Sequence, residues 1–136
     1  AAVKNTKGGI GYVEYAYAKR NKLTHMQVQN QAGQFVNPDD TTFAAAAAGV
    51  DWFSVPGMGV SMVNAKGEKA WPISTASFIL MYREPANEAQ SAEVLKFFDW
   101  AFKNGKAAAA ELDYVALPDA LTAQIRAKVW SQINAK

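Results

Sequence analysis

The sequence predicts an α/β fold. Short runs of β-favouring residues alternate with glycine turns in the first half of the chain. A long run of β-branched and aromatic residues opens the second half, and two stretches with helical apolar spacing follow it. Half of the 136 residues are hydrophobic, which is enough for a real core in a chain of single-domain length.

Composition excludes several classes of function. The formal charge of +2 comes from 14 basic and 12 acidic residues, which are scattered along the chain, so nucleic acid is not an expected partner. No apolar stretch approaches the roughly 20 residues that span a bilayer. The absence of cysteine excludes disulfides and thiolate metal sites. Because the first residue is Ala1 and not Met, we expect a chain that is processed or cut from something longer.

The first 38 residues predict three elements. Residues 9–15 combine β-favouring side chains with glycine and predict a short strand. Residues 14–21 predict a short helix, because Lys19 and Arg20 would complement the helix dipole in its last turn. Residues 26–30 and 34–38 alternate around Gly33 and predict a small hairpin.

A helix is predicted over 38–49, where Pro38 and Asp39 precede an alanine body and Gly49 ends it. Residues 50–67 contain several turn formers and predict a mostly irregular segment. The two sections of the chain, 1–70 and 71–136, are then expected to meet near residue 70.

The second section predicts one long strand and then helices. Residues 71–85 suit a strand with a buried middle. A buried helix is predicted from residue 86 to Asn104 and Gly105, and 106–113 predict a short alanine-rich turn of helix. Residues 117–134 repeat apolar side chains every four residues after Pro118, which predicts a second amphipathic helix.

No residue pattern predicts catalysis or metal binding. His25 is the single histidine, without partners for a metal site, so a surface or packing role is expected. Asp39 and Asp40 could be an acid and base pair, but carboxylates at a helix start are favoured as caps.

Three further patterns allow a ligand role and a structural role. Gly8, Gly9 and Gly11 resemble a phosphate loop faintly, but a turn is favoured because no Walker-type Lys and Ser or Thr follow. Residues 74–77, "STAS", could offer hydroxyl donors to an anion, although neighbours on a strand face opposite ways. The four tryptophans could form a stacking platform, but core packing is favoured: Trp52, Trp71, Trp100 and Trp130.

Three stretches carry a family resemblance: "GGIGYVEYAYAKRNKL", "GEKAWPISTASFILMYRE" and "AEVLKFFDWAFKNGKAAAAELDYVALPDAL". They resemble the C-terminal part of the periplasmic phosphate-binding proteins that supply the ABC phosphate importer. The resemblance runs over nearly the whole chain. It is strongest at "VLKFFDWAFKNG" followed by "LDYVALPD".

The resemblance implies a two-lobe periplasmic binding protein fold of type II. Residues 1–70 would complete one lobe. The chain would cross a hinge near Trp71, Pro72 and Ile73, and 71–136 would complete the other lobe. It also implies a periplasmic protein without a cofactor that is no enzyme, with inorganic phosphate, the N-terminal part of the same protein and the membrane permease as partners.

The family's phosphate ligands would lie upstream, because its Ser-Gly-Thr motif and the preceding arginine do not occur here. Arg20, Arg83 and Arg126 lack that pattern, so no phosphate-binding residue is expected in this chain. Two alternatives stay open, a fragment of a related phosphatase-like enzyme and a fragment with a separate interaction role. An incomplete two-lobe fold would leave edges unpaired, so we expect the chain alone to be unstable or self-associating.

Overall fold

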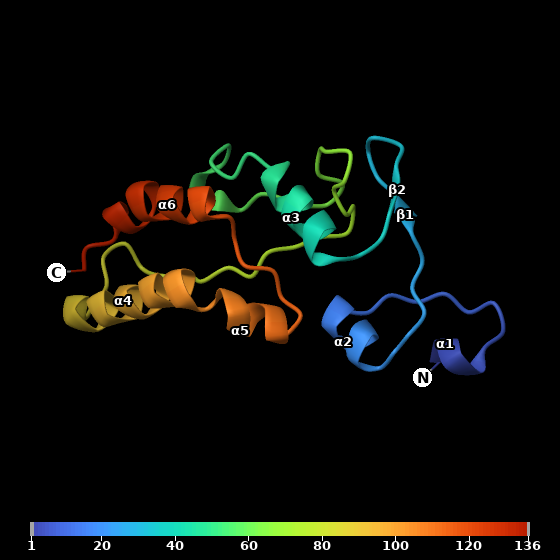
Figure 1. Cartoon of the computed structure of the whole chain (residues 1–136). Coiled ribbons are helices and arrows are strands. Elements are labelled where there is room, and N and C mark those ends of the chain that lie inside the picture. The colour runs from blue at the N-terminus through green and yellow to red at the C-terminus, as the bar shows by residue number, and fades with distance from the viewer. Residues whose placement is uncertain (1, 136) are drawn as a thin grey trace.

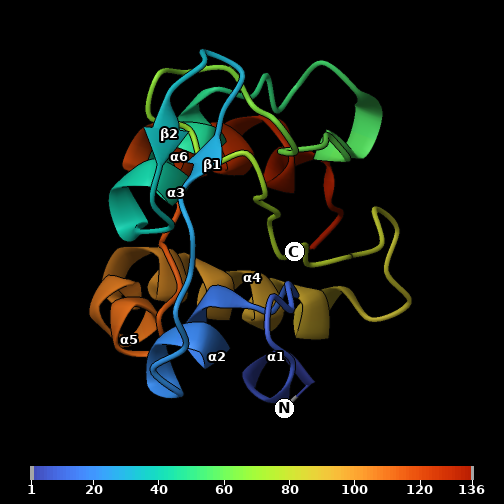
Figure 2. The same ribbon diagram turned by 90° about the vertical axis from the view of Figure 1, so that its right-hand side faces the viewer.

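The computed structural model of the chain describes residues 2–135, and its elements form two layers (Figures 1 and 2). One layer holds the hairpin, α3 and α6, and the other holds α1, α2, α4 and α5. The helices and strands are α1 (Ala2–Asn5), α2 (Tyr15–Arg20), β1 (Val28–Gln29), β2 (Phe35–Val36), α3 (Asp40–Ala48), α4 (Glu88–Asn104), α5 (Lys106–Glu111) and α6 (Asp119–Lys128). Two short 3₁₀ turns cover Pro56–Met58 and Trp130–Gln132.

The N-terminal region confirms the predicted helix and corrects the predicted strand. The helix over 14–21 is α2, whose N-cap Glu14 accepts a hydrogen bond from the Tyr17 amide at 3.3 Å. The strand over 9–15 is wrong, because 9–14 are assigned to no strand and Tyr15 already belongs to α2. A strand needs a neighbour for its backbone groups, and no described segment supplies one here.

The predicted hairpin is confirmed as β1 and β2, with Val28 opposite Val36 in an antiparallel register. Gly33 has φ +79° in the connecting turn, a conformation that suits glycine. The buried Asn30 side chain ties the hairpin to the stretch that follows the irregular segment, since its amide donates to the Glu68 and Ala70 carbonyls at 2.8 and 3.2 Å. The side-chain oxygen Oδ1 of Asn30 accepts hydrogen bonds from the Ala32 and Gln34 amides. Both polar atoms of this buried side chain are therefore hydrogen-bonded.

Helix α3 begins and ends as predicted. Asp39 is its N-cap and accepts from the Thr42 amide at 2.9 Å, while Thr42 Oγ1 accepts from the Asp39 amide at 3.0 Å. This reciprocal capping box satisfies two groups at the helix start. Gly49 is the C-cap residue. The capping role expected for Asp39 is therefore confirmed.

Asp39→Ala is expected to loosen the first turn of α3 by about 1 kcal/mol, because the amide of Thr42 loses its acceptor. Hydrogen exchange at the Thr42 amide should accelerate roughly five-fold, the equivalent of that free energy. Asp40→Ala is the matched control, since Asp40 lies in the first turn but is not the cap. Equal acceleration in both variants would contradict a capping role.

The core lies where α3, the irregular segment and α6 meet. Its buried members are Ala46, Ala47, Trp52, Met62, Ala65, Ala70 and Leu121. Trp52 Nε1 donates to the Ala47 carbonyl at 2.9 Å, which fixes the indole against α3. The irregular character predicted for 50–67 is confirmed. Leu121 belongs to α6, so residues from both sides of position 70 share this core, and the boundary there stays a prediction.

The long strand predicted over 71–85 is wrong. The segment is extended but is assigned to no strand, and it passes between the two layers in Figures 1 and 2. Leu80 is 92% exposed and Tyr82 is 83% exposed, so the expected buried middle is open to solvent. The sequence has the composition of a central strand, but the described residues form only a two-stranded sheet elsewhere.

The three C-terminal helices are confirmed as α4, α5 and α6, but α4 is not a buried helix. None of its residues is buried, and Phe97 and Trp100 are 59% and 58% exposed. The helix stacks Phe102 on Trp130, just after α6, whereas Phe97 and Trp100 stack on each other and stay mostly exposed. The prediction treated all the aromatic positions as one buried face, and that is the error.

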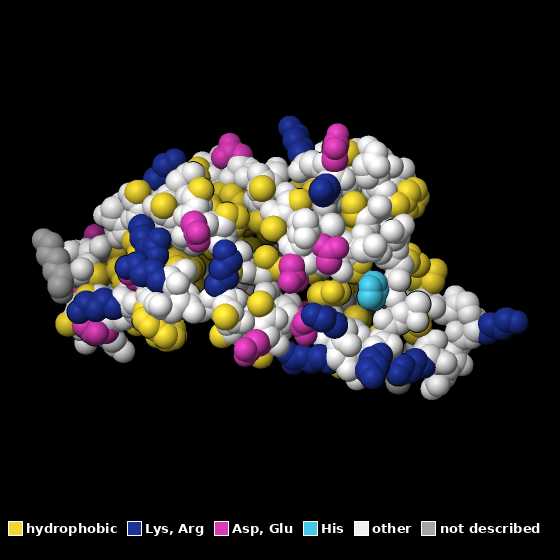
Figure 3. All heavy atoms as spheres, in the orientation of Figure 1, with side chains coloured by type: hydrophobic (Ala, Val, Ile, Leu, Met, Phe, Trp, Pro, Cys, Tyr) yellow, Lys and Arg dark blue, Asp and Glu magenta, His cyan; other side chains and the backbone are white. Residues whose placement is uncertain are grey.

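The surface is large for a chain of this mass. It measures 9808 Å², whereas a compact folded monomer of 14.7 kDa exposes roughly 6,900 Å². Figure 3 shows hydrophobic side chains at the surface among the charged ones. No helix in the described part of the chain is long and apolar enough to cross a membrane.

Candidate functional site

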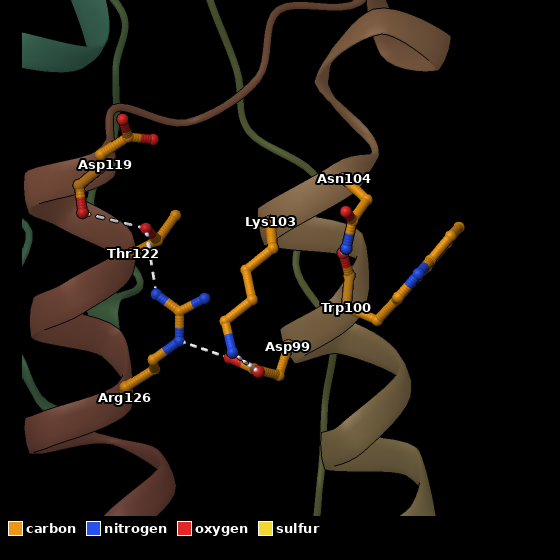
Figure 4. Close-up of polar contacts among 7 residues, drawn as sticks. All are labelled: Asp99, Trp100, Lys103, Asn104, Asp119, Thr122 and Arg126. Carbon is orange, nitrogen blue, oxygen red and sulfur yellow. Dashed lines mark hydrogen bonds and ion pairs between the residues drawn. The ribbon is translucent and has the colours of Figure 1, made fainter.

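A shallow, open groove of about 480 Å³ lies between α4 and α6. Figure 4 shows its polar side chains, which approach from the two helices. The groove is lined by Leu95, Lys96, Asp99, Trp100, Lys103, Asn104, Arg126 and Trp130. The groove combines cations with aromatic rings, the groups that bind anions or stack on planar ligands.

Asp99 is the centre of the groove's charge. Arg126 Nε donates to Asp99 Oδ1 at 2.6 Å, and the Lys103 ammonium donates to Asp99 Oδ2 (Figure 4). The hydrogen bond from Lys103 and then that from Arg126 hold the pKa of the Asp99 carboxyl below its ordinary value. An anion entering the groove would have to displace this carboxylate from both cations.

Arg126 is further fixed by aromatic rings. Its guanidinium carbon lies 5.7 Å from the Phe102 ring centre and 5.8 Å from that of Trp130. The two rings stack with centres 5.6 Å apart and planes 6° from parallel. Arg126 Nη1 also donates to Thr122 Oγ1 at 3.4 Å. The guanidinium is thus used to join α4 and α6, which is a structural role.

A second ion cluster joins α2 to the turn after α5. Asp113 has φ +64°, and its side chain is 9% exposed. It accepts from Lys19 Nζ at 2.5 Å, with Arg20 Nε at 3.5 Å. The hydrogen bond with Lys19 is the main cause that lowers the pKa of the Asp113 carboxyl and raises that of the Lys19 ammonium. Arg20 also donates to the Leu112 carbonyl at 3.2 Å.

The three arginines considered as anion ligands all have other partners. Arg20 and Arg126 belong to the two clusters above. Arg83 donates to the Gln132 side-chain oxygen. The structure does not bring these three side chains to one site, since each binds a different element. The absence of phosphate ligands from this chain stays a prediction.

The other candidate residues have mainly structural contacts. His25 Nδ1 lies 3.3 Å from the Leu23 carbonyl, and its ring meets Tyr15 edge-on at 6.2 Å. Among residues 2–135 no group of three or more His, Asp or Glu side chains is placed to hold a metal ion. Gly8 has φ +77° in a turn after α1, and Ser74 Oγ donates to the Trp71 carbonyl at 3.1 Å.

The tryptophans divide into two groups. Trp52 and Trp71 are buried, as core packing predicts. Trp130 is half-buried against Phe102, while Trp100 is largely exposed and stacks on Phe97 at 6.3 Å. The core role predicted for Trp100 is therefore wrong in this chain, because its indole is 58% exposed.

Sequence reasoning missed the two aspartates that organise the ion clusters. Asp99 could have been found, because Lys103 follows it at the i,i+4 spacing of a helical ion pair. Asp113 could not, because 94 positions separate it from Lys19 and no local pattern indicates the contact.

Lys103→Met is expected to raise the pKa of the Asp99 carboxyl more than Arg126→Met does, because the Lys103 hydrogen bond is the larger cause of its lowering. The carboxyl carbon of Asp99, followed by NMR titration, reports this directly. Since the folded-state pKa is lowered, this ion pair stabilises the fold above the unfolded-state value near 3.9 and the contribution disappears as pH falls through the folded value. Identical titration curves in both variants and the parent chain would contradict the assignment.

Comparison with curated proteins relates the chain to one family. It is 48% identical over 134 residues to the phosphate-binding protein PstS of Pasteurella multocida, covering 98% of this chain and 39% of the relative. The Haemophilus influenzae protein of the same name is 50% identical over 93% of this chain and 38% of its own length. The Xylella fastidiosa strain 9a5c protein is 47% identical over 92% and 34%. No protein-family model matches the chain.

These relatives are binding proteins by name. The chain corresponds to the C-terminal portion of phosphate-binding proteins of the PstS family, as the resemblance of the three quoted stretches predicted. It spans between about a third and two fifths of the length of these relatives. Such relatives imply a periplasmic binding protein fold. The described residues form a small fragment of helices with one two-stranded sheet.

Proposed function

We propose that the chain is the C-terminal portion of a periplasmic receptor that captures inorganic phosphate and delivers it to the permease of an ABC importer. The observation that carries the proposal is the identity of 47–50% to PstS proteins over 92–98% of this chain. In this proposal the preceding portion of the polypeptide supplies the phosphate ligands, and this chain completes the two lobes around them. The hinge crosses near Trp71, between the sections 1–70 and 71–136.

The ion clusters support a scaffold role for this portion. Both clusters place each cation against a carboxylate: Asp99 holds Lys103 and Arg126 in the α4–α6 groove, where Lys96 pairs with Glu93. Phosphate receptors need donors that are free to meet the anion, because a carboxylate already paired with the cation competes with it. The groove therefore suits helix packing better than phosphate capture.

Phosphate titration of two proteins tests the proposal. One is this chain, and the other is an extended form, meaning this chain together with the preceding portion that PstS relatives carry. Calorimetry should show one phosphate bound per molecule of the extended form, and no binding to the chain alone. Sulfate serves as the control anion for general charge attraction. Stoichiometric phosphate binding by the chain alone, or none by the extended form, would contradict the proposal.

A further inference from the structure

The C-terminal end of α4 contains the one asparagine of the sequence that is followed by glycine, which is Asn104 before Gly105. Asparagine is a thermolabile residue, because the next backbone nitrogen can attack its side-chain carbonyl carbon. A side chain on the following residue hinders this attack, and glycine has none. Asn104 is exposed at the surface, so water reaches it.

The helix end itself favours this pair of residues. The Gly105 amide donates to the Ala101 carbonyl at 2.7 Å, which closes the last turn of α4. A Cβ atom at position 105 would lie 2.6 Å from that carbonyl oxygen, so any larger residue would displace the backbone. The Asn104 side-chain amide donates to the Trp100 carbonyl at 2.9 Å (Figure 4). Two local contacts therefore place asparagine directly before glycine.

We propose that Asn104 is a deamidation site whose reaction is controlled by opening of the last turn of α4. The Gly105 nitrogen forms a bond to the side-chain carbonyl carbon of Asn104, and the side-chain nitrogen leaves as ammonia with the proton of the Gly105 amide. Water then breaks one of the two carbon–nitrogen bonds of the five-membered imide, which yields aspartate or isoaspartate. This chemistry does not depend on phosphate binding.

The closed helix end opposes the reaction. The proton of the attacking Gly105 nitrogen is held by the Ala101 carbonyl, and the side-chain nitrogen that must leave is held by the Trp100 carbonyl. Both hydrogen bonds have to break before the two reacting atoms of Asn104 and Gly105 can meet. Helix ends open locally at a small cost in free energy, so the reaction is slowed and not prevented.

The product would keep the helix end open. An aspartate or isoaspartate at position 104 has no side-chain N–H that could donate to the Trp100 carbonyl. Its negative charge would lie at the C-terminal end of α4, where the helix dipole disfavours an anion. Asn104 also lines the α4–α6 groove, so deamidation would add a carboxylate to a groove in which Asp99 already pairs with two cations.

Peptide mapping by mass spectrometry tests the proposal in the extended form, incubated at mildly alkaline pH with and without urea. In urea, Asn104 should convert before any other asparagine. In the native sample it should convert several-fold to about ten-fold more slowly, because the helix end must open first. Equal rates with and without urea would overturn the control by α4. No conversion in the native sample, or earlier conversion of another asparagine, would overturn the site.

Asn21 provides a matched control at the end of α2. Its side-chain amide donates to the Tyr17 carbonyl at 2.9 Å, the same contact that Asn104 makes with Trp100, but Lys22 follows it. Asn21 should therefore stay intact while Asn104 reacts. Lys22 has φ +50°, a conformation that suits glycine, so Lys22→Gly should fit the turn and make Asn21 a second site of deamidation.

Asn104→Gln is the second variant, because it keeps a side-chain amide but cannot close the five-membered imide. It should abolish the change in mass of the peptide that contains position 104 and leave the circular dichroism unaltered. A persistent change in mass in that peptide would overturn the assignment to Asn104. An intact Asn21 in urea-unfolded Lys22→Gly would also overturn the proposal, because the following glycine would then not select the site.

Discussion

The chain alone is expected to lack a sharp thermal transition and to form a broad range of oligomers. Six of its eleven buried hydrophobic residues are alanines, and none of the large side chains in the described part is fully buried. Folded domains are stable by only about 5–15 kcal/mol, a small difference between burial and chain entropy. This core buries few large apolar side chains. The free energy gained by burial therefore offsets little of the conformational entropy that the chain loses on folding.

Exposed strand-like segments add a route to association. Residues 10–13 and 73–82 make no backbone–backbone hydrogen bond to another described residue, and they expose apolar side chains such as Ile10, Tyr12 and Leu80. Unpaired backbone groups of this kind form hydrogen bonds with the same groups of other chains, which gives oligomers without a defined stoichiometry.

Scanning calorimetry and sedimentation velocity measure both expectations. The extended form is the control and should give a single mass and a cooperative transition. A monodisperse 136-residue monomer that melts in one cooperative step would contradict the expectation, because it would show that the described contacts are enough for a stable fold.

The helices were predictable from sequence because their signals are local. Asp39 and Gly49 mark the two ends of α3 within a dozen residues, and Asn104 and Gly105 mark the end of α4. The hairpin was predictable for the same reason, since its two short strands are separated only by the turn around Gly33. In each case the partners of the backbone groups lie a few positions away.

The two wrong strands have no local partner. A strand over 9–15 or 71–85 needs a distant neighbour to accept its hydrogen bonds, and no described residue provides one. The sequence composition predicts what these segments would do in a complete sheet. The ion pair of Asp113 and Lys19 was not predictable for the same reason, because the two residues are far apart in the sequence. The pair of Asp99 and Lys103 follows directly from the i,i+4 spacing of a helix.

Trp52→Ala is expected to have the largest effect of any single substitution in the described core. The indole is 7% exposed, lies among the alanines of α3 and donates to the Ala47 carbonyl. Removing a buried Trp side chain typically costs about 3–5 kcal/mol through lost transfer energy and the cavity left behind. The Ala47 carbonyl would also lose its indole donor in a buried place.

Hydrogen exchange of the α3 amides measures this in the chain itself, without requiring a cooperative global transition. Protection of α3 should disappear in Trp52→Ala, because a loss of this size exceeds what so small a core can sustain locally. Trp52→Phe should retain part of the protection, since a ring still fills most of the space but cannot donate to Ala47. Trp100→Ala removes an indole that is 58% exposed, so α3 should exchange as in the parent chain. Equal effects of Trp52→Ala and Trp100→Ala on the exchange of the α3 amides would contradict this expectation. They would mean that the buried indole of Trp52 stabilises α3 no more than the exposed indole of Trp100 does.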